Sequence, residues 1–206
     1  LPLGEYDIER LAYEIERVDL RMAGGKQDQY AATFGGFNFM QFLPDDKVIV
    51  NPLRIRQRYQ DELAHNLLLY YTETSHVSAE IIQGQIDNVR ANNTSSIEAM
   101  HRRKEPAAKM REHPRRGDID TIGEILNEGW EEKKKTAKRI SNPLLEDIYS
   151  TAISAGATGG KVSGAGGGGF MFFYCPGTSR YAVEKALCSK FAGQAKRYEF
   201  TQEGLK

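Results

Sequence analysis

A glycine-rich segment is the first candidate for chemistry in this chain. Residues 161–170 read KVSGAGGGGF, with five glycines from Gly164 to Gly169. Glycine loses extra backbone entropy on folding, so this density indicates a tight turn or a close approach to a ligand. Successive backbone N–H groups in such a loop can bind an anion. We expect a phosphate-related role, and a hairpin packed under a helix is the alternative. The candidate phosphate-binding residues are Ser163, Gly164, Ala165, Gly166, Gly167 and Gly168.

The best-known nucleotide motifs do not account for this loop. Gly164, Gly166 and Gly169 match G-x-G-x-x-G, but the dinucleotide fingerprint requires a helix to follow, and the apolar run FMFFY at 170–174 predicts a strand. The sequence also contains no G-x-x-x-x-G-K-[ST], so a Walker P-loop is excluded.

A second candidate segment, GGKQDQY at residues 24–30, places an acid close to a base. Asp28 could serve as a general base or an orienting carboxylate for a sugar hydroxyl, and Lys26 would keep it ionised. The alternative from spacing alone is an exposed aspartate that caps a helix.

The remaining polar residues carry weaker signals. The four histidines lack metal-ligand spacing. The basic runs 102–104, 115–116 and 133–135 are interpreted as solvated helix faces, with phosphate contact as the alternative. Thr72, near the end of an expected strand, could line a cleft. Cys175 and Cys188 are expected to be buried free thiols.

Periodicity predicts an α+β protein with an antiparallel pair of strands at its centre. Ser95 is expected to open a helix as a capping box that His113-Pro114 ends, and Asp118 to begin the next helix. Asn142-Pro143 is expected to cap another helix. The other expected helices are 7–20, 26–33, 76–93 and one after Thr178. The expected strands are 37–42, 47–51, 67–72, 160–163, 170–175 and 195–200.

Composition describes an ordinary globular chain of 206 residues with a formal net charge of zero. A nucleic-acid partner usually requires a basic surplus, so none is expected. No apolar run approaches the roughly 20 residues of a membrane span. There is no signal peptide, so we expect a cytoplasmic protein without a membrane partner. The change in composition at residues 51–66 indicates two domains, 1–60 and 61–206.

The two candidate segments together resemble the GHMP kinases, the family of galactokinase, homoserine kinase and mevalonate kinase. Residues 24–32, followed by Phe34-Gly35-Gly36, are similar to the segment that carries the family's catalytic aspartate. Residues 161–169 resemble its third conserved motif, with LYYT at 69–72 in between. The resemblance implies the tail of a GHMP N-terminal α/β domain followed by a ferredoxin-like C-terminal domain with an antiparallel sheet and helices.

Within that family, residues 12–17 and 25–29 most resemble the D-glycero-D-manno-heptose 7-phosphate kinases. The resemblance implies transfer of the γ-phosphoryl of ATP, with Mg²⁺, to the anomeric hydroxyl of the heptose 7-phosphate. Asp28 and Lys26 would be catalytic, and the loop at residues 163–168 would support the phosphates. The substrate-binding residues would be Gly25, Gln29, Tyr30 and Thr72.

One departure from the family pattern concerns its second motif. The Gly/Ser-rich loop that holds the ATP phosphates, the N-terminal substrate-binding segment and the acid that binds Mg²⁺ are all expected upstream of Leu1, and none occurs in this sequence. We therefore expect the chain alone to lack competent ATP and Mg²⁺ binding, and to expose strand edges that favour a homodimer. The open alternatives are a non-catalytic α+β module that binds an anion or a partner, and a galactokinase-like or fucokinase-like enzyme.

Overall fold

The computed structural model describes residues 3–74 and 78–205. The chain divides into two compact units. The first comprises the residues up to Ile55 together with those from Glu199 onward, and the second runs from Arg56 to Tyr198. The boundary expected after residue 60 lies inside helix α3 (Gln57–Asn66), and the last residues belong to the first unit rather than to the second.

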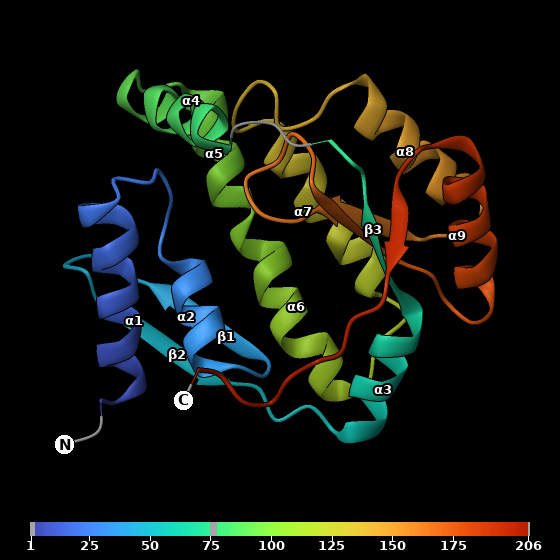
Figure 1. Cartoon of the computed structure of the whole chain (residues 1–206), viewed down its shortest axis with the longest axis horizontal. Coiled ribbons are helices and arrows are strands. Elements are labelled where there is room, and N and C mark those ends of the chain that lie inside the picture. The colour runs from blue at the N-terminus through green and yellow to red at the C-terminus, as the bar shows by residue number, and fades with distance from the viewer. Residues whose placement is uncertain (1–2, 75–77, 206) are drawn as a thin grey trace. The chain divides into compact units, whose positions relative to one another are not determined.

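The first unit contains two helical segments and a β-hairpin (Figure 1). Helix α1 (Glu5–Tyr13) continues as the π-helix η1 (Glu14–Asp19), and α2 (Gln27–Phe34) follows. Strands β1 (Asn38–Phe42) and β2 (Val48–Pro52) pair antiparallel. Aromatic rings hold the helices and hairpin together, because the Tyr6 ring of α1 lies 5.0 Å from Phe34 of α2 and the Tyr30 ring of α2 lies 5.9 Å from Phe42 of β1.

The C-terminal segment joins this unit through its backbone. Gly36 N donates to Thr201 O at 2.9 Å, and Leu205 N donates to Ala32 O at 3.0 Å. Gly35 has φ +59°, and a Cβ there would lie 2.3 Å from the backbone of Glu203. Only glycine permits both this dihedral angle and this approach. The strand predicted through residue 200 ends earlier, at Lys196.

The second unit is built on a four-stranded antiparallel sheet with the order β4-β5-β3-β6. The strands are β3 (Leu67–Tyr71), β4 (Gly159–Val162), β5 (Phe170–Tyr174) and β6 (Gln194–Lys196). Strand β6 is shorter than the 195–200 expected. The fold class, an α+β arrangement with a central antiparallel sheet, is confirmed.

Seven helices accompany this sheet in the part of the second unit that the structure describes, and α7, α8 and α9 lie beside it (Figure 1). Helix α7 (Ile122–Lys134) approaches β4 closely: a Cβ at Gly159 would lie 1.8 Å from Gly123 O. Trp130 of α7 is buried against the sheet core. The helices are α3, α4 (Ser78–Arg90), α5 (Thr94–Arg102), α6 (Lys104–Arg116), α7 (Ile122–Lys134), α8 (Pro143–Ser154) and α9 (Ser179–Lys190).

Two predicted helix starts were wrong and one was confirmed. Helix α5 is capped by Asn93, whose side chain accepts from Ser96 N at 3.1 Å, so the capping box at Ser95 does not form. Helix α7 begins at Ile122, after the expected Asp118. Asn142 caps α8 as expected, because its side chain accepts from Leu145 N at 3.0 Å.

Pro114 does not end the helix in which it lies. The segment expected as one helix divides at Arg103 into α5 and α6, and α6 continues through Pro114 to Arg116. Gly117 ends it with φ +91°, the left-handed conformation that favours glycine at a helix C-terminus.

Both cysteines are free; Cys175 is buried as expected, but Cys188 is exposed, which corrects the expectation for that residue. Among the described residues, no helix has the length and apolar character needed to cross a membrane.

Candidate active site

The segment that leads to Asp28 is held by one arginine. Arg17 of η1 donates from Nε to Gly25 O at 3.1 Å and from its guanidinium to Met22 O at 3.3 Å. A Cβ at Gly24 would lie 2.5 Å from the Arg17 guanidinium carbon, so the glycine leaves room for this side chain. Arg17 therefore positions the turn that begins α2. This role of Arg17 was not predicted from the sequence.

Asp28 lies in the first turn of α2 with its side chain exposed. The N-terminus of a helix favours a negative charge through the helix dipole. No described residue forms a hydrogen bond or ion pair with its carboxylate, which is therefore available to accept a proton from a ligand hydroxyl.

Lys26 has a different partner from the one expected. Its Nζ donates to the carboxylate of Asp46 and lies 4.9 Å from the centroid of the Tyr13 ring. Asp46 belongs to the β1–β2 turn, where it has φ +60°. The pair joins the start of α2 to the hairpin. Nothing in the spacing of the sequence relates residue 26 to residue 46, so this contact was missed.

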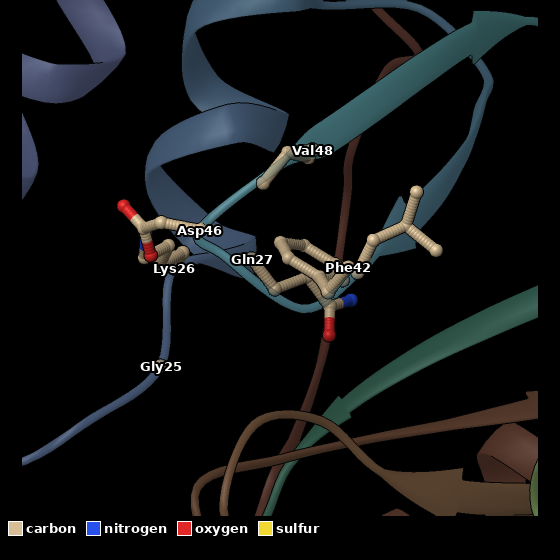
Figure 2. A pocket seen from close by; sticks show the side chains of 7 residues that line it. Gly25, Lys26, Gln27, Phe42, Asp46 and Val48 are labelled. Carbon is tan, nitrogen blue, oxygen red and sulfur yellow. The ribbon is translucent and has the colours of Figure 1, made fainter.

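A pocket of about 380 Å³ lies where this segment meets the hairpin (Figure 2). Figure 2 shows the Lys26 and Asp46 side chains together at one side and Gln27 beside Phe42 at the other. The pocket thus combines one polar edge with an apolar wall. Its lining residues are Gly25, Lys26, Gln27, Phe42, Leu43, Asp46 and Val48.

Gln29 and Tyr30, both predicted to bind substrate, lie in the interior of the first unit. Gln29 is 4% exposed, and its Nε2 donates to Glu16 Oε2 at 2.6 Å. Tyr30 is 6% exposed within the aromatic cluster, and its hydroxyl hydrogen-bonds to Glu9. Burial and this carboxylate raise the pKa of Tyr30. Both side chains therefore support α2 from within its own unit.

Part of the glycine loop in the second unit is explained by close packing. Gly166 and Gly168 have φ +123° and +151°. A Cβ at Gly166 would lie 2.9 Å from Ile140 O, and one at Gly168 would lie 2.5 Å from Thr74 O. The N–H groups of Gly167 and Gly169 are also used internally, donating to Ile140 O and Thr74 O. For these residues the packing interpretation holds.

The start of the loop is open. Ser163 and Gly164 are exposed, and a Cβ at Gly164 would meet no atom within 4 Å, although its φ is +72°. Among the backbone hydrogen bonds of the described residues, none uses the N–H groups of Gly164 or Ala165. The anion-binding interpretation therefore applies to this end of the loop.

Thr72, the remaining predicted substrate-binding residue, supports the loop. Its backbone N and its Oγ1 both donate to Gly169 O at 2.9 Å, and the side chain is buried. Below the other end of the loop, Lys133 donates from Nζ to Gly164 O. The solvated face predicted for residues 133–135 is wrong for Lys133, which is 5% exposed.

The candidate residues thus form two groups. Gly25, Lys26 and Asp28 lie in the first unit, and Thr72 lies with the glycine loop in the second. Among the described residues, no three histidine, cysteine or carboxylate side chains lie together as a metal site. The first group offers a carboxylate and a pocket, and the second offers backbone donors beside the buried Lys133.

Comparison with known proteins gives three findings. Residues 97–193 match the family described as GHMP kinases C terminal. The whole chain is 48% identical over 206 residues to the D-glycero-alpha-D-manno-heptose 7-phosphate kinase of Campylobacter jejuni, and covers 60% of that protein. Over 165 residues it is 27% identical to the L-fucokinase/L-fucose-1-P guanylyltransferase of Bacteroides fragilis, covering 74% of this chain and 16% of that protein.

A solved structure of a related kinase has a similar fold. The D-glycero-D-manno-heptose 1-phosphate kinase of Bacteroides thetaiotaomicron superposes with a TM-score of 0.74 at 40% identity, over 99% of this chain and 55% of that one. This chain therefore spans less than two thirds of the length of both heptose phosphate kinases. The match of the C-terminal family domain, the high identity and the shared fold together show that the chain belongs to the GHMP kinase family.

Proposed function

We propose that this chain forms part of an ATP-dependent kinase that phosphorylates the anomeric hydroxyl of D-glycero-D-manno-heptose 7-phosphate. The observation that carries the proposal is the 48% identity, over all 206 residues, to a protein named for that substrate. The free carboxylate of Asp28 and the open end of the glycine loop are the two features that such a transfer requires.

In the proposed reaction the anomeric oxygen attacks the γ-phosphorus of ATP. A new P–O bond forms to the sugar, the bond to the β-phosphate oxygen breaks, and ADP leaves. Asp28 orients the hydroxyl and accepts its proton. The N–H groups at the start of the loop, those of residues 164 and 165, donate to phosphate oxygens. Phosphoryl transfer depends mainly on such positioning and charge stabilisation.

Mg²⁺ would neutralise the phosphate charge when bound with the nucleotide. The described residues hold no cluster of three candidate ligands, so we assign it none in this chain. The 206 residues also contain no Gly/Ser-rich ATP loop of the kind expected for the family. We therefore expect little or no turnover by the chain alone.

The test is a chimaera in which this chain is joined to the part of the C. jejuni kinase that it does not cover. Release of ADP is followed with heptose 7-phosphate and ATP. Asp28→Asn should reduce kcat by about 10²- to 10⁴-fold, the usual loss when a general base is removed. Asp45→Asn is the matched control, because Asp45 is exposed in the hairpin turn, and asparagine tolerates its φ of +57°.

A substrate panel tests the acceptor. The two heptose kinases carry names that differ in the position of the phosphate, so the panel contains heptose 7-phosphate, heptose 1-phosphate, L-fucose and galactose. We expect the highest kcat/KM with heptose 7-phosphate. It is the one member of the panel that has both a free anomeric hydroxyl and a phosphate at the other end of the sugar. Preference for L-fucose or galactose would favour the other sugar kinases, and no transfer by an intact chimaera would remove the kinase proposal.

A further inference from the structure

The pocket of the first unit contains one cation, Lys26, among the seven residues that line it (Figure 2). Its volume of about 380 Å³ lies within the range of small-molecule sites, about 300–1,000 Å³. Phe42, Leu43 and Val48 supply apolar surface, and Asp46 is the carboxylate of the lining. A pocket with this lining suits a ligand that has a carbon skeleton and one negatively charged group.

Lys26 is held in place without being neutralised by a buried partner. Its side chain is 20% exposed, and its Nζ lies 4.9 Å from the centroid of the Tyr13 ring. An aromatic face stabilises a cation and leaves its charge intact. Asp46, the carboxylate that pairs with Lys26, is 82% exposed. Exposed ion pairs contribute little to stability, so a more highly charged anion that enters the pocket can replace Asp46 at Lys26.

The start of α2 adds to the attraction for an anion. The helix begins at Gln27, and its N-cap residue, Lys26, makes no side-chain cap hydrogen bond. The first N–H groups of a helix have no partner within it and lie at its positive end, where phosphate groups bind. A Cβ at Gly25 would meet no atom within 4 Å, so the backbone that leads to this helix end is open to a ligand.

The pocket also lies within reach of the proposed catalytic carboxylate. Lys26 and Asp28 are separated by one residue, so their Cα atoms are at most about 7 Å apart. One ligand can therefore contact both side chains if its charged group and its reacting hydroxyl stand at opposite ends of a short carbon chain. Heptose 7-phosphate has this form, with the anomeric hydroxyl on C1 and the phosphate on C7, whereas galactose and L-fucose have no phosphate.

We propose that Lys26 and the pocket around it bind the phosphate of the acceptor sugar, and that this phosphate displaces Asp46 from Lys26. The pair then selects the acceptor, because a sugar without phosphate leaves Lys26 bonded to Asp46. The identity of the sugar rests on the proposed function. Binding of a sugar phosphate by the pocket does not require phosphoryl transfer, so the two proposals can fail separately.

The first test uses the 206-residue chain, which contains every residue that lines the pocket. Calorimetry compares heptose 7-phosphate with the same heptose without phosphate, and the phosphorylated sugar should bind more tightly. Lys26→Gln should weaken its binding by roughly ten- to a hundredfold, as expected for the loss of a charge-assisted hydrogen bond. Lys47→Gln is the matched control, since it removes the same charge from an exposed residue of the same hairpin. Equal effects of the two substitutions, or no binding of heptose 7-phosphate by the wild-type chain, would overturn the site.

Replacement of Asp46 distinguishes displacement from a structural role of the pair. If the phosphate displaces Asp46, Asp46→Asn removes a competitor, and heptose 7-phosphate should bind roughly two- to fivefold more tightly, the range expected for an exposed ion pair. Asp45→Asn, in the same turn and also at positive φ, should leave the affinity unchanged. If the pair only braces the pocket, Asp46→Asn weakens binding as Lys26→Gln does, and that result would refute the displacement.

Kinetics of the chimaera with the C. jejuni kinase assign the phosphate to the acceptor or to the donor. Lys26→Gln should raise KM for heptose 7-phosphate more than KM for ATP, and should lower the preference for this sugar over unphosphorylated heptose. A larger rise in KM for ATP would assign Lys26 to the nucleotide and overturn the proposal. If the chimaera transfers no phosphate while the chain still binds heptose 7-phosphate through Lys26, the kinase proposal fails and the pocket assignment stands.

Discussion

Two alanine substitutions in the glycine loop separate the cost of a backbone dihedral angle from the cost of crowding. Gly164 and Gly168 both have positive φ, at +72° and +151°. A side chain at residue 164 would meet open space, but at residue 168 its Cβ would lie 2.5 Å from Thr74 O and 2.7 Å from Thr74 Oγ1. Gly164→Ala is therefore the matched control for Gly168→Ala.

The expected losses of stability follow from two costs, that of a positive φ and that of steric overlap. A non-glycine residue at positive φ costs about 1–2 kcal/mol, which is the whole expected effect of Gly164→Ala. Gly168→Ala adds a steric overlap with backbone, and overpacking of this kind costs about 1–3 kcal/mol more. We therefore expect losses in the free energy of unfolding of about 1–2 kcal/mol at residue 164 and about 2–5 kcal/mol at residue 168.

Urea unfolding followed by tryptophan fluorescence measures this difference. Trp130 is the single tryptophan of the chain, and it is 1% exposed in the core of the second unit. The unfolding midpoint should shift while the slope against urea stays constant. Equal losses in the two variants would refute the conclusion that Gly168 is required by its contact with Thr74.

The remaining predictions concern a helix cap and a buried acid. Asn142→Ala should cost about 1 kcal/mol of stability in urea unfolding, whereas Thr178→Ala should cost much less, because Thr178 makes no side-chain cap bond to α9; similar costs would contradict the assigned cap. Burial raises the pKa of Glu9 above its usual 4.5, against the opposing hydrogen bond from Tyr30. The folded protein then binds this proton more tightly, so stability should fall as pH rises from about 4.5 through the raised pKa. Glu9→Gln should flatten that part of the profile in thermal unfolding followed by circular dichroism, and an unchanged slope would exclude Glu9 as its source.

The elements were largely predictable because their signals are local. Apolar periodicity located most of the helices and strands, and the Asn142-Pro143 cap acts within one turn of its own helix. The errors occurred where two local signals competed. Asn93 and Ser95 could each cap α5, and in the structure Asn93 provides the cap. A proline normally ends a helix, but α6 continues through Pro114 and is ended by Gly117.

The candidate site was predictable as motifs but not as contacts. Its glycines were identified from density alone, yet that density does not distinguish Gly166 and Gly168, which are crowded by backbone, from Gly164, which is open. Similarly, the spacing around Asp28 indicated a carboxylate beside a lysine, whereas Lys26 bonds to Asp46 across the hairpin.

The sequence by itself therefore determined the family, the α+β class and the segments that contain the candidate functional residues. Each of these depends on residues that lie close together in the chain. Only the tertiary structure decided which side of α7 is buried, turning Lys133 inward while Lys134 and Lys135 reach carboxylates. The local sequence pattern does not distinguish these three consecutive lysines from one another. Their different environments arise because folding places Lys133 against Gly164, which lies 31 residues further along the chain.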